Sequence, residues 1–316
     1  MNYYFAPMEG LTDSIYRKLH HQYFGGVDRY YMPFLSPTVH RALTPREARE
    51  LPKADSVGFA AVPQLLTKVP EDFLWAASVC RDLGYEEVNL NIGCPSGTVT
   101  AKGKGAGMLR DPDALDQFLE RIFSATALPV SIKTRIGFSD ADELPRLMDI
   151  FNQYPVKELT VHPRVRNAFY KGSVDMDAFA YCMDNASMPL CYNGNICSRD
   201  QIRWLQAQFP KLQSVMIGRG LIGDPGMLLP CGTTADSLEG FMEALFQVYR
   251  EVFGSERNAM FRLKENWRHL LCLFEGSERL GRQLRKATDA SEYHRIVQQI
   301  LHTLPLRTAL APDWDI

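Results

Sequence analysis

The 316-residue sequence contains no apolar run that approaches the roughly 18 residues a membrane-spanning helix needs. Residues 1–10 lack a basic segment followed by an apolar stretch, so we expect no signal peptide. An excess of one charge is also missing, because 35 Lys and Arg stand against 37 Asp and Glu, for a net charge of −2. Any contact with nucleic acid therefore has to come from a local basic patch. These absences predict a soluble, cytoplasmic protein that does not bind a membrane.

Cysteines at metal-binding or disulfide-forming spacings are also missing. The seven cysteines are odd in number and include no Cys-x-x-Cys pair. A disulfide framework and a zinc site are therefore not expected, and we predict no metal. A reducing compartment fits this pattern, because a single thiol stays available for chemistry there.

Short apolar runs alternate with amphipathic helical segments, such as Glu71–Leu83 and Pro112–Phe123, over the first two thirds of the chain. Near-continuous apolar strands that alternate with helices are typical of a parallel sheet covered on both faces. Eight such units predict a (β/α)8 TIM barrel, with a doubly wound open sheet as the alternative. The expected strands are Tyr3–Ala6, Arg29–Pro33, Val57–Leu65, Glu87–Asn91, Pro129–Lys133, Glu158–Val161, Pro189–Tyr192 and Ser214–Ile217.

The alternation stops after about Asp236. Apolar residues three and four positions apart then form one stripe from Leu238 to Val252, including Val248, and further stripes from Met260 and from Ile296. This spacing is typical of packed helices. We therefore predict two domains, a barrel over residues 1–234 and an all-α domain over residues 235–316.

Five of the expected strands end in polar or glycine-rich residues. These ends are Asn91–Pro95, Lys133–Arg135, His162–Arg164, Asn193–Asn195 and Gly218–Gly220. In a barrel, the carboxyl ends of the strands meet at one rim, where active sites of this fold are built. The sequence therefore predicts one active site at that rim.

The last two of these ends follow the seventh and eighth strands, where barrels often bind a phosphate. Glycine allows backbone N–H groups to approach the anion, and Arg219 adds positive charge. Either segment alone is typical of an ordinary turn. As a pair they predict a site for a phosphorylated cofactor or substrate.

Cys94 lies in a rim loop between Gly93 and Pro95, which favours a reactive thiol, although most lone cysteines are small buried hydrophobes. The segment Gly103–Met108 matches no phosphate-binding P-loop, and we predict a mobile lid there. Lys133 and Arg135 stand two positions apart on one expected strand, so their side chains should point to the same side. Lys133 suits a cation beside an anionic ring, a Schiff base, or a plain salt bridge.

His162 shares the predicted rim with Cys94 and Lys133, which favours a functional histidine over a structural one. Beyond the barrel, the run Arg279–Lys286 contains no acidic residue. Such a run is usually a solvated helix face, and it also suits contact with an RNA backbone.

The ordered motifs resemble those of the tRNA-dihydrouridine synthases. They are Ala6-Pro-Met-Glu-Gly-Leu-Thr-Asp, Gln64, Asn91-Ile-Gly-Cys-Pro-Ser-Gly-Thr-Val, Gly103 to Leu109, Ser131-Ile-Lys-Thr-Arg-Ile-Gly, Val161-His-Pro-Arg, Tyr170-Lys-Gly, Asn193-Gly-Asn-Ile and Ile217-Gly-Arg-Gly. They cover nearly the whole predicted barrel, and the helical tail is similar to the family's tRNA-binding domain.

The resemblance implies an FMN cofactor reduced by NADPH, and tRNA as the substrate. Flavin would deliver a hydride to C6 of a flipped uracil, and Cys94 would protonate C5. The implied substrate contacts are Asn91, Arg135, Arg164 and Tyr170. The implied FMN contacts are Pro7, Met8, Glu9, Gln64, Lys133, His162, Asn193, Gly194, Asn195, Gly218 and Arg219.

Three other functions remain open at this point. The first is an FMN barrel enzyme that acts on a free small molecule, in the manner of dihydroorotate dehydrogenase. The second is a flavin-free aldolase or isomerase that uses Lys133, and the third is a non-catalytic RNA-binding protein.

Overall fold

The computed structural model describes residues 1–38 and 40–310 of the chain. Its central sheet has nine strands in the order β3-β2-β1-β9-β8-β7-β6-β5-β4. The outermost two, β3 (Ala61–Val62) and β4 (Gln64–Leu65), are consecutive in the sequence and separated only by Pro63. The sheet therefore closes into a barrel in which a proline, lacking an N–H group, divides one strand into two. The predicted (β/α)8 barrel is confirmed, and the open sheet is excluded.

The other strands lie within two residues of their predicted positions. They are β1 (Asn2–Phe5), β2 (Arg29–Tyr31), β5 (Val88–Ile92), β6 (Val130–Arg135), β7 (Leu159–His162), β8 (Leu190–Tyr192) and β9 (Ser214–Ile217). The predicted strand Val57–Leu65 was too long at its start. A short 3-10 helix, Ala54–Ser56, precedes it, and Gly58 has a φ of +81°, which breaks the extended backbone.

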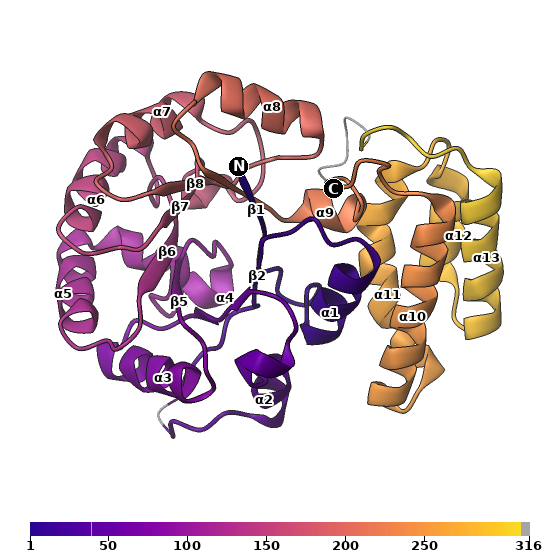
Figure 1. Cartoon of the computed structure of the whole chain (residues 1–316), viewed down its shortest axis with the longest axis horizontal. Coiled ribbons are helices and arrows are strands. Elements are labelled where there is room, and N and C mark those ends of the chain that lie inside the picture. Colours follow the sequence, from indigo (N-terminus) through magenta and orange to yellow (C-terminus); the bar gives the residue numbers. More distant parts are fainter. Residues whose placement is uncertain (39, 311–316) are drawn as a thin grey trace. The chain divides into compact units, whose positions relative to one another are not determined.

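Helices α3 (Pro70–Asp82), α5 (Pro112–Phe123), α6 (Leu144–Phe151) and α7 (Met176–Asn185) follow one another around the strands (Figure 1). In α5, Asp111 caps the first turn by accepting a hydrogen bond from Ala114 N, and Pro112 occupies the first turn. Its buried face, from Leu115 to Ile122, is the predicted one. Three further helices are α2 (Pro45–Glu50), α4 (Gly97–Thr100) and α8 (Arg199–Gln208).

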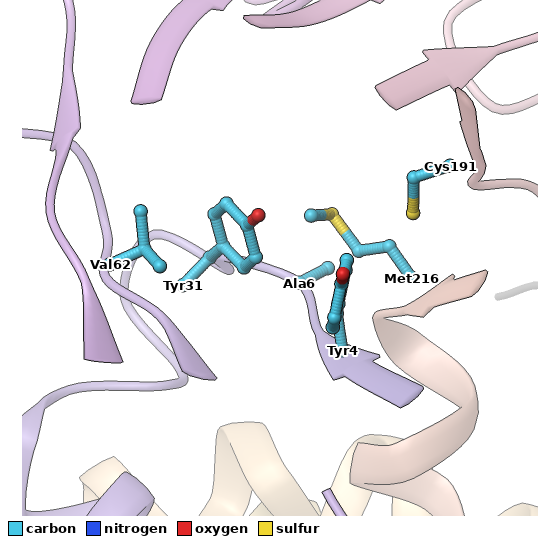
Figure 2. Packing of buried hydrophobic residues seen from close by; sticks show 6 residues of the cluster. All are labelled: Tyr4, Ala6, Tyr31, Val62, Cys191 and Met216. Atoms are coloured by element: carbon cyan, nitrogen blue, oxygen red, sulfur yellow. The ribbon is translucent and has the colours of Figure 1, made fainter. Parts of the chain in front are cut away.

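Side chains fill the interior of the barrel. Figure 2 shows six that point toward one another from five strands or their ends: Tyr4, Ala6, Tyr31, Val62, Cys191 and Met216. None is more than 5% exposed. The barrel is therefore a packed core, and chemistry has to take place at its rim.

By its internal contacts the described chain divides into two compact units. The barrel unit contains Met1–Glu9, Asp28–Gly194 and Trp204–Met216, and the helical unit contains Gly10–Val27, Asn195–Arg203 and the chain from Ile217 onward. The helical unit includes α1 (Ser14–Tyr23), α9 (Arg219–Gly223), α10 (Ala235–Phe253), α11 (Glu256–Leu270), α12 (Glu278–Lys286) and α13 (Ala290–Thr303). The division into domains at residue 234 stays a prediction, and residues 311–316 of the second domain lie outside the described residues.

Within the helical unit, α1 packs on α10 through the rings of Tyr16 and Phe241, whose centroids lie 5.3 Å apart. The apolar stripe predicted for α10 was wrong at its end, because Val252 is 45% exposed. Tyr249 is buried instead, and its hydroxyl donates to the carboxylate of Asp13 at 2.8 Å. Among the described helices of the whole chain, none is both long and apolar enough to cross a membrane.

Candidate active site

Cys94 follows β5 and is held by the side chain at the end of that strand. Asn91 Oδ1 accepts hydrogen bonds from the backbone N–H groups of Gly93, at 3.1 Å, and Cys94, at 2.9 Å. The thiol is half-buried. Since Asn91 is only 6% exposed, this turn has a fixed anchor inside the barrel rim.

A directed chain of side-chain hydrogen bonds, here called the amide ladder, runs from Asn91 into the barrel. Asn91 Nδ2 donates to Gln64 Oε1 at 2.8 Å, and Gln64 Nε2 donates to Asn89 Oδ1 at 2.8 Å. Asn89 Nδ2 then donates to Ser131 Oγ at 2.9 Å, and this hydroxyl donates to Glu87 Oε1 at 2.6 Å. Every donor points toward the Glu87 carboxylate, and hydrogen bonds aligned in one direction polarise one another.

Two cations pair with Glu87, the last acceptor of the ladder. Glu87 Oε2 lies 3.1 Å from Arg29 Nη1 and 2.6 Å from Lys157 Nζ. Two such ion pairs fix the buried carboxylate in place. The ladder therefore fixes the orientation of Gln64, whose side-chain amide already has a partner on each of its two atoms.

The glycine-rich segment after Cys94 packs under the thiol loop. Residues 105–109 are buried, and Ala106 N donates to Cys94 O at 3.1 Å. Gly105 has a φ of +56°, and a Cβ there would lie 3.0 Å from Cys94 O. In the structure these residues support the Cys94 loop, and movement of the segment as a lid stays a prediction.

Electrostatics connect Cys94 with Lys133 of β6. Burial raises the pKa of the Cys94 thiol, and the nearby charges of Lys133 and Arg135 offset this only in part. The thiol is therefore protonated at neutral pH. Burial and the charge of Arg135 lower the pKa of Lys133 to about 8, and no described carboxylate pairs with it.

Arg135, at the end of β6, is 1% exposed and is bonded to backbone on both sides of the rim. Its Nε donates to Gly93 O at 3.0 Å, and its Nη1 donates to Val165 O at 3.0 Å. Burial lowers the pKa of Arg135 to about 10. Its guanidinium carbon lies 5.3 Å from the ring centroid of Tyr170, which is 42% exposed. Arg135 thus connects the Cys94 loop to the loop after β7.

His162 and Arg164 hold that second loop. Arg164 Nη1 lies 3.0 Å from His162 Nε2, and Arg164 donates to the carbonyl oxygens of Lys171, at 3.3 Å, and Gly172, at 2.5 Å. The His162 ring lies 5.9 Å from that of Tyr170. Arg164 is buried and donates to the backbone of this loop, and its contact with substrate stays a prediction.

The remaining predicted residues lie in two places. In the barrel unit, Pro7 and Met8 are half-buried after β1, and the exposed Glu9 carboxylate forms an ion pair with Arg46 at 2.5 Å. Glu9 is also close enough to raise the pKa of Cys94. Asn193 Nδ2 donates to Met216 O at 2.7 Å, and Gly194 is buried beside it.

In the helical unit, Arg219 Nη2 donates to Asn195 Oδ1 at 3.4 Å, and Gly218 precedes the first turn of α9. Asn195 has a φ of +46°, a conformation that asparagine tolerates better than most residues. A Cβ on Gly220 would lie 2.1 Å from Ile196 O, so only glycine fits there. Phosphate binding by these residues stays a prediction.

The sequence alone did not identify three members of the amide ladder, which are Glu87, Asn89 and Ser131. The available signal was strand alternation, since Glu87, Asn89 and Asn91 occupy every second position along β5 and just before it. Ser131 and Lys133 repeat this pattern on β6. Among the described residues, no cluster of His, Cys, Asp and Glu has the arrangement of a metal site.

Comparisons with known proteins identify the family of the chain. The family described as Dihydrouridine synthase (Dus) matches residues 4–304. The tRNA-dihydrouridine synthase B of Pasteurella multocida is 28% identical over 223 residues, which are 70% of this chain and 66% of that protein. Its counterpart in Vibrio cholerae is 27% identical over 265 residues, covering 79% of this chain and 81% of that protein.

A probable tRNA-dihydrouridine synthase of Rhodobacter capsulatus is 30% identical over 227 residues, covering 71% of this chain and 68% of that protein. Among solved structures, morphinone reductase matches with a TM-score of 0.51 at 11% identity, over 72% of this chain and 84% of that one. At this identity the structural match supports the barrel fold alone. Because the family match spans almost the whole chain, the protein belongs to the dihydrouridine synthase family of enzymes.

Proposed function

We propose that the protein reduces the C5=C6 bond of uridines in tRNA to 5,6-dihydrouridine, with FMN as cofactor and NADPH as electron donor. The family match and the names of the relatives support the reaction and the substrate. The observation that carries the proposal is the geometry of Cys94: a half-buried thiol at the barrel rim, in a loop whose backbone N–H donates to Asn91 Oδ1 at 2.9 Å.

The residues present fit a flavin. Lys133 is a poorly solvated cation at the rim without a described carboxylate partner, and a reduced flavin is an anion that needs such a cation. Bound FMN would supply the hydride that adds to C6 of uracil. The residues proposed to hold its ring are Pro7, Met8, Glu9, Gln64, Lys133 and His162, and those proposed for its phosphate are Asn193, Gly194, Asn195, Gly218 and Arg219.

Cys94 is the proposed catalytic acid. Hydride addition at C6 leaves negative charge at C5 and O4, and the thiol proton is transferred to C5. The raised pKa of Cys94 keeps this proton in place at neutral pH, and water reprotonates the thiolate after the step. Asn91 and Arg135 position the Cys94 loop, and we propose that they, Arg164 and Tyr170 also contact uracil or a nearby phosphate.

The substrate has to place its uracil beside Cys94. Bases stacked in folded RNA cannot reach such a site, so the target nucleotide is flipped out. In the helical unit, α12 exposes Arg279, Arg282, Arg285 and Lys286 while burying Leu280 and Leu284. We propose that this basic face contacts the tRNA backbone, and that the enzyme acts in the cytoplasm.

The deciding experiment compares substrates. The purified protein, loaded with FMN and supplied with NADPH, is incubated with unmodified tRNA and, separately, with free uridine and orotate. We expect dihydrouridine in tRNA, detected by mass spectrometry of nucleosides, and no turnover of the free compounds. Turnover of the free compounds alone would instead support an enzyme similar to dihydroorotate dehydrogenase, and a protein unable to bind flavin would exclude both.

A further inference from the structure

A cluster of two arginines and two aromatic rings lies in the barrel unit, outside the residues assigned so far; Arg110 and Phe169 are exposed, and Phe138 and Arg166 are half-buried. We call it the arginine–aromatic platform; its members are Arg110, Phe138, Arg166 and Phe169. The guanidinium carbon of Arg166 lies 4.8 Å from the centroid of Phe169 and 5.3 Å from that of Phe138. The guanidinium carbon of Arg110 lies 4.1 Å from the centroid of Phe138. The rings and guanidinium groups therefore form one contiguous cluster.

The positive charge of the platform is not neutralised by the protein. Among residues 1–38 and 40–310, neither Arg110 nor Arg166 pairs with a carboxylate, and the buried Nε of Arg166 has no hydrogen-bond partner. Both arginines are instead tied to Thr100, Arg110 through the carbonyl oxygen at 3.4 Å and Arg166 through the hydroxyl at 3.0 Å. Two fixed cations beside aromatic rings suit a ligand with both phosphates and flat bases.

The Phe169 ring is partly exposed, and its backbone is strained. Phe169 has φ +51° and ψ −106°, a conformation that L-residues with large side chains rarely adopt, and its side chain is 40% exposed. Exposing a large apolar ring and straining its backbone both cost free energy. Strain of this kind gathers at ligand-binding sites, where it preorganises a side chain.

The platform is connected to the Cys94 loop through two sets of contacts. Thr100 ends α4, which begins three residues after Cys94, and Thr100 N donates to Ser96 O at 2.9 Å. On the other side, Phe169 precedes Tyr170, whose ring contacts Arg135, and Arg135 in turn donates to Gly93 O. Both connections lead to the loop that carries the thiol.

We infer that the arginine–aromatic platform stacks a base of the nucleotide next to the target uridine in tRNA. This inference rests on the proposed function. When one base is flipped out, its neighbour loses a stacking partner, and an aromatic face beside the pocket replaces that partner. The arginines would bind the adjoining phosphates. Phe169 is thus a substrate-binding residue for the flanking nucleotide, with Arg166 as its cationic partner.

The test compares Phe169→Leu with Phe169→Trp in the FMN-loaded protein. Leucine keeps the same apolar character and backbone strain but has no aromatic face, whereas tryptophan keeps the face. Trp204→Leu is the matched control, since Trp204 is a 49% exposed ring on α8. The KM for unmodified tRNA and the rate of flavin reduction by NADPH without tRNA are measured for each variant.

We expect Phe169→Leu to raise the KM for tRNA about tenfold, the range of one base–aromatic stack. Phe169→Trp and Trp204→Leu should stay near the parent value, and flavin reduction should not change in any variant. An unchanged KM in Phe169→Leu would overturn the inference, and so would a weaker interaction with NADPH, which would assign the ring to the electron donor.

A binding measurement covers the case in which the leucine variant does not fold. The parent protein contains four tryptophans, so the signal of the new tryptophan is the difference in fluorescence between Phe169→Trp and the parent. We expect tRNA to quench this difference in the absence of NADPH. A difference that tRNA leaves unchanged would also overturn the inference. A parent protein that forms no dihydrouridine would sink the proposed function. A parent protein that forms dihydrouridine, together with an unchanged KM for tRNA in Phe169→Leu, would contradict only the inference about the platform.

Discussion

The backbone N–H of Cys94 donates a 2.9 Å hydrogen bond to Asn91 Oδ1, three residues earlier in the chain. Asn91 belongs to β5 and Cys94 follows that strand, yet the orientation of the Asn91 amide depends on Gln64, which comes from β4. The position of the thiol loop is therefore set by neighbouring strands of the barrel, through the amide ladder.

Removal of one ladder hydroxyl should destabilise the protein. Ser131→Ala leaves Glu87 Oε1 and Asn89 Nδ2 without their shared partner in the buried interior. We expect the free energy of unfolding in urea to fall by about 1–3 kcal/mol. Ser78→Ala is the control, because the Ser78 hydroxyl donates only to Trp75 O within α3. Equal stability of the two variants would argue against the ladder.

Cys94→Ala should lower dihydrouridine formation by about 100-fold or more, the usual contribution of a general acid. Flavin reduction by NADPH should be unaffected, and Cys231→Ala, at an exposed thiol, should behave like the parent.

The same role predicts a pH profile. A general acid has to be protonated, and burial raises the pKa of Cys94. Activity should therefore persist through neutral pH and fall only as the pH rises through the raised pKa of the thiol. Full activity in Cys94→Ala, or a decline that begins on the acidic side of neutrality, would remove Cys94 from this role.

Gly105→Ala should reduce activity without a direct effect on substrate. The new Cβ would lie 3.0 Å from Cys94 O and 2.9 Å from Val99 Cγ1, and φ is +56°. The thiol loop has to shift, and a displacement of this kind costs about tenfold to a hundredfold in rate. Gly97→Ala, in the same loop but with no neighbour within 4 Å, should be active. Similar rates for both variants would contradict the packing argument.

Lys133 should destabilise the flavin-free protein at neutral pH. Its pKa falls from 10.5 to about 8 on folding, chiefly through burial, so between these values the unfolded state holds a proton that the native state has released. The free energy of unfolding therefore rises as the pH increases from 8 to 10.5. Below pH 8 the lysine is charged in both states, and the full destabilisation by the buried charge is present.

Lys133→Met removes that cost. We expect the flavin-free variant to be more stable than the parent by ~1–3 kcal/mol at pH 7, with the difference shrinking toward pH 10.5. Urea unfolding at pH 7 and pH 10 measures this. A variant that is less stable at pH 7 would show that the ammonium has a stabilising partner. The same substitution should weaken flavin binding.

The basic face of α12 should determine how tRNA binding depends on salt. Arg282→Gln removes one exposed charge, so the slope of log K against log salt concentration should become shallower by about 1. Arg203→Gln is the control, because Arg203 forms an ion pair with Asp200 at 3.0 Å on α8. An unchanged slope in Arg282→Gln would exclude contact between this face and the phosphates.

The sequence alone determined the barrel, nearly all of its strands and the position of Cys94 in a rim loop. These features are local, because apolar periodicity and the residues that end a strand are read over a few positions. The tertiary structure decided which side chains meet. It placed residues 105–109 against the Cys94 loop as a support, and it buried Tyr249 where Val252 was expected.

The amide ladder and the arginine–aromatic platform were also decided only by the tertiary structure. Gln64 and Asn89 lie 25 residues apart, and Thr100 and Arg166 lie 66 residues apart. No sequence period connects such pairs. They come into contact because closing the sheet sets the register of its strands, and that register depends on the packing of the whole barrel at once.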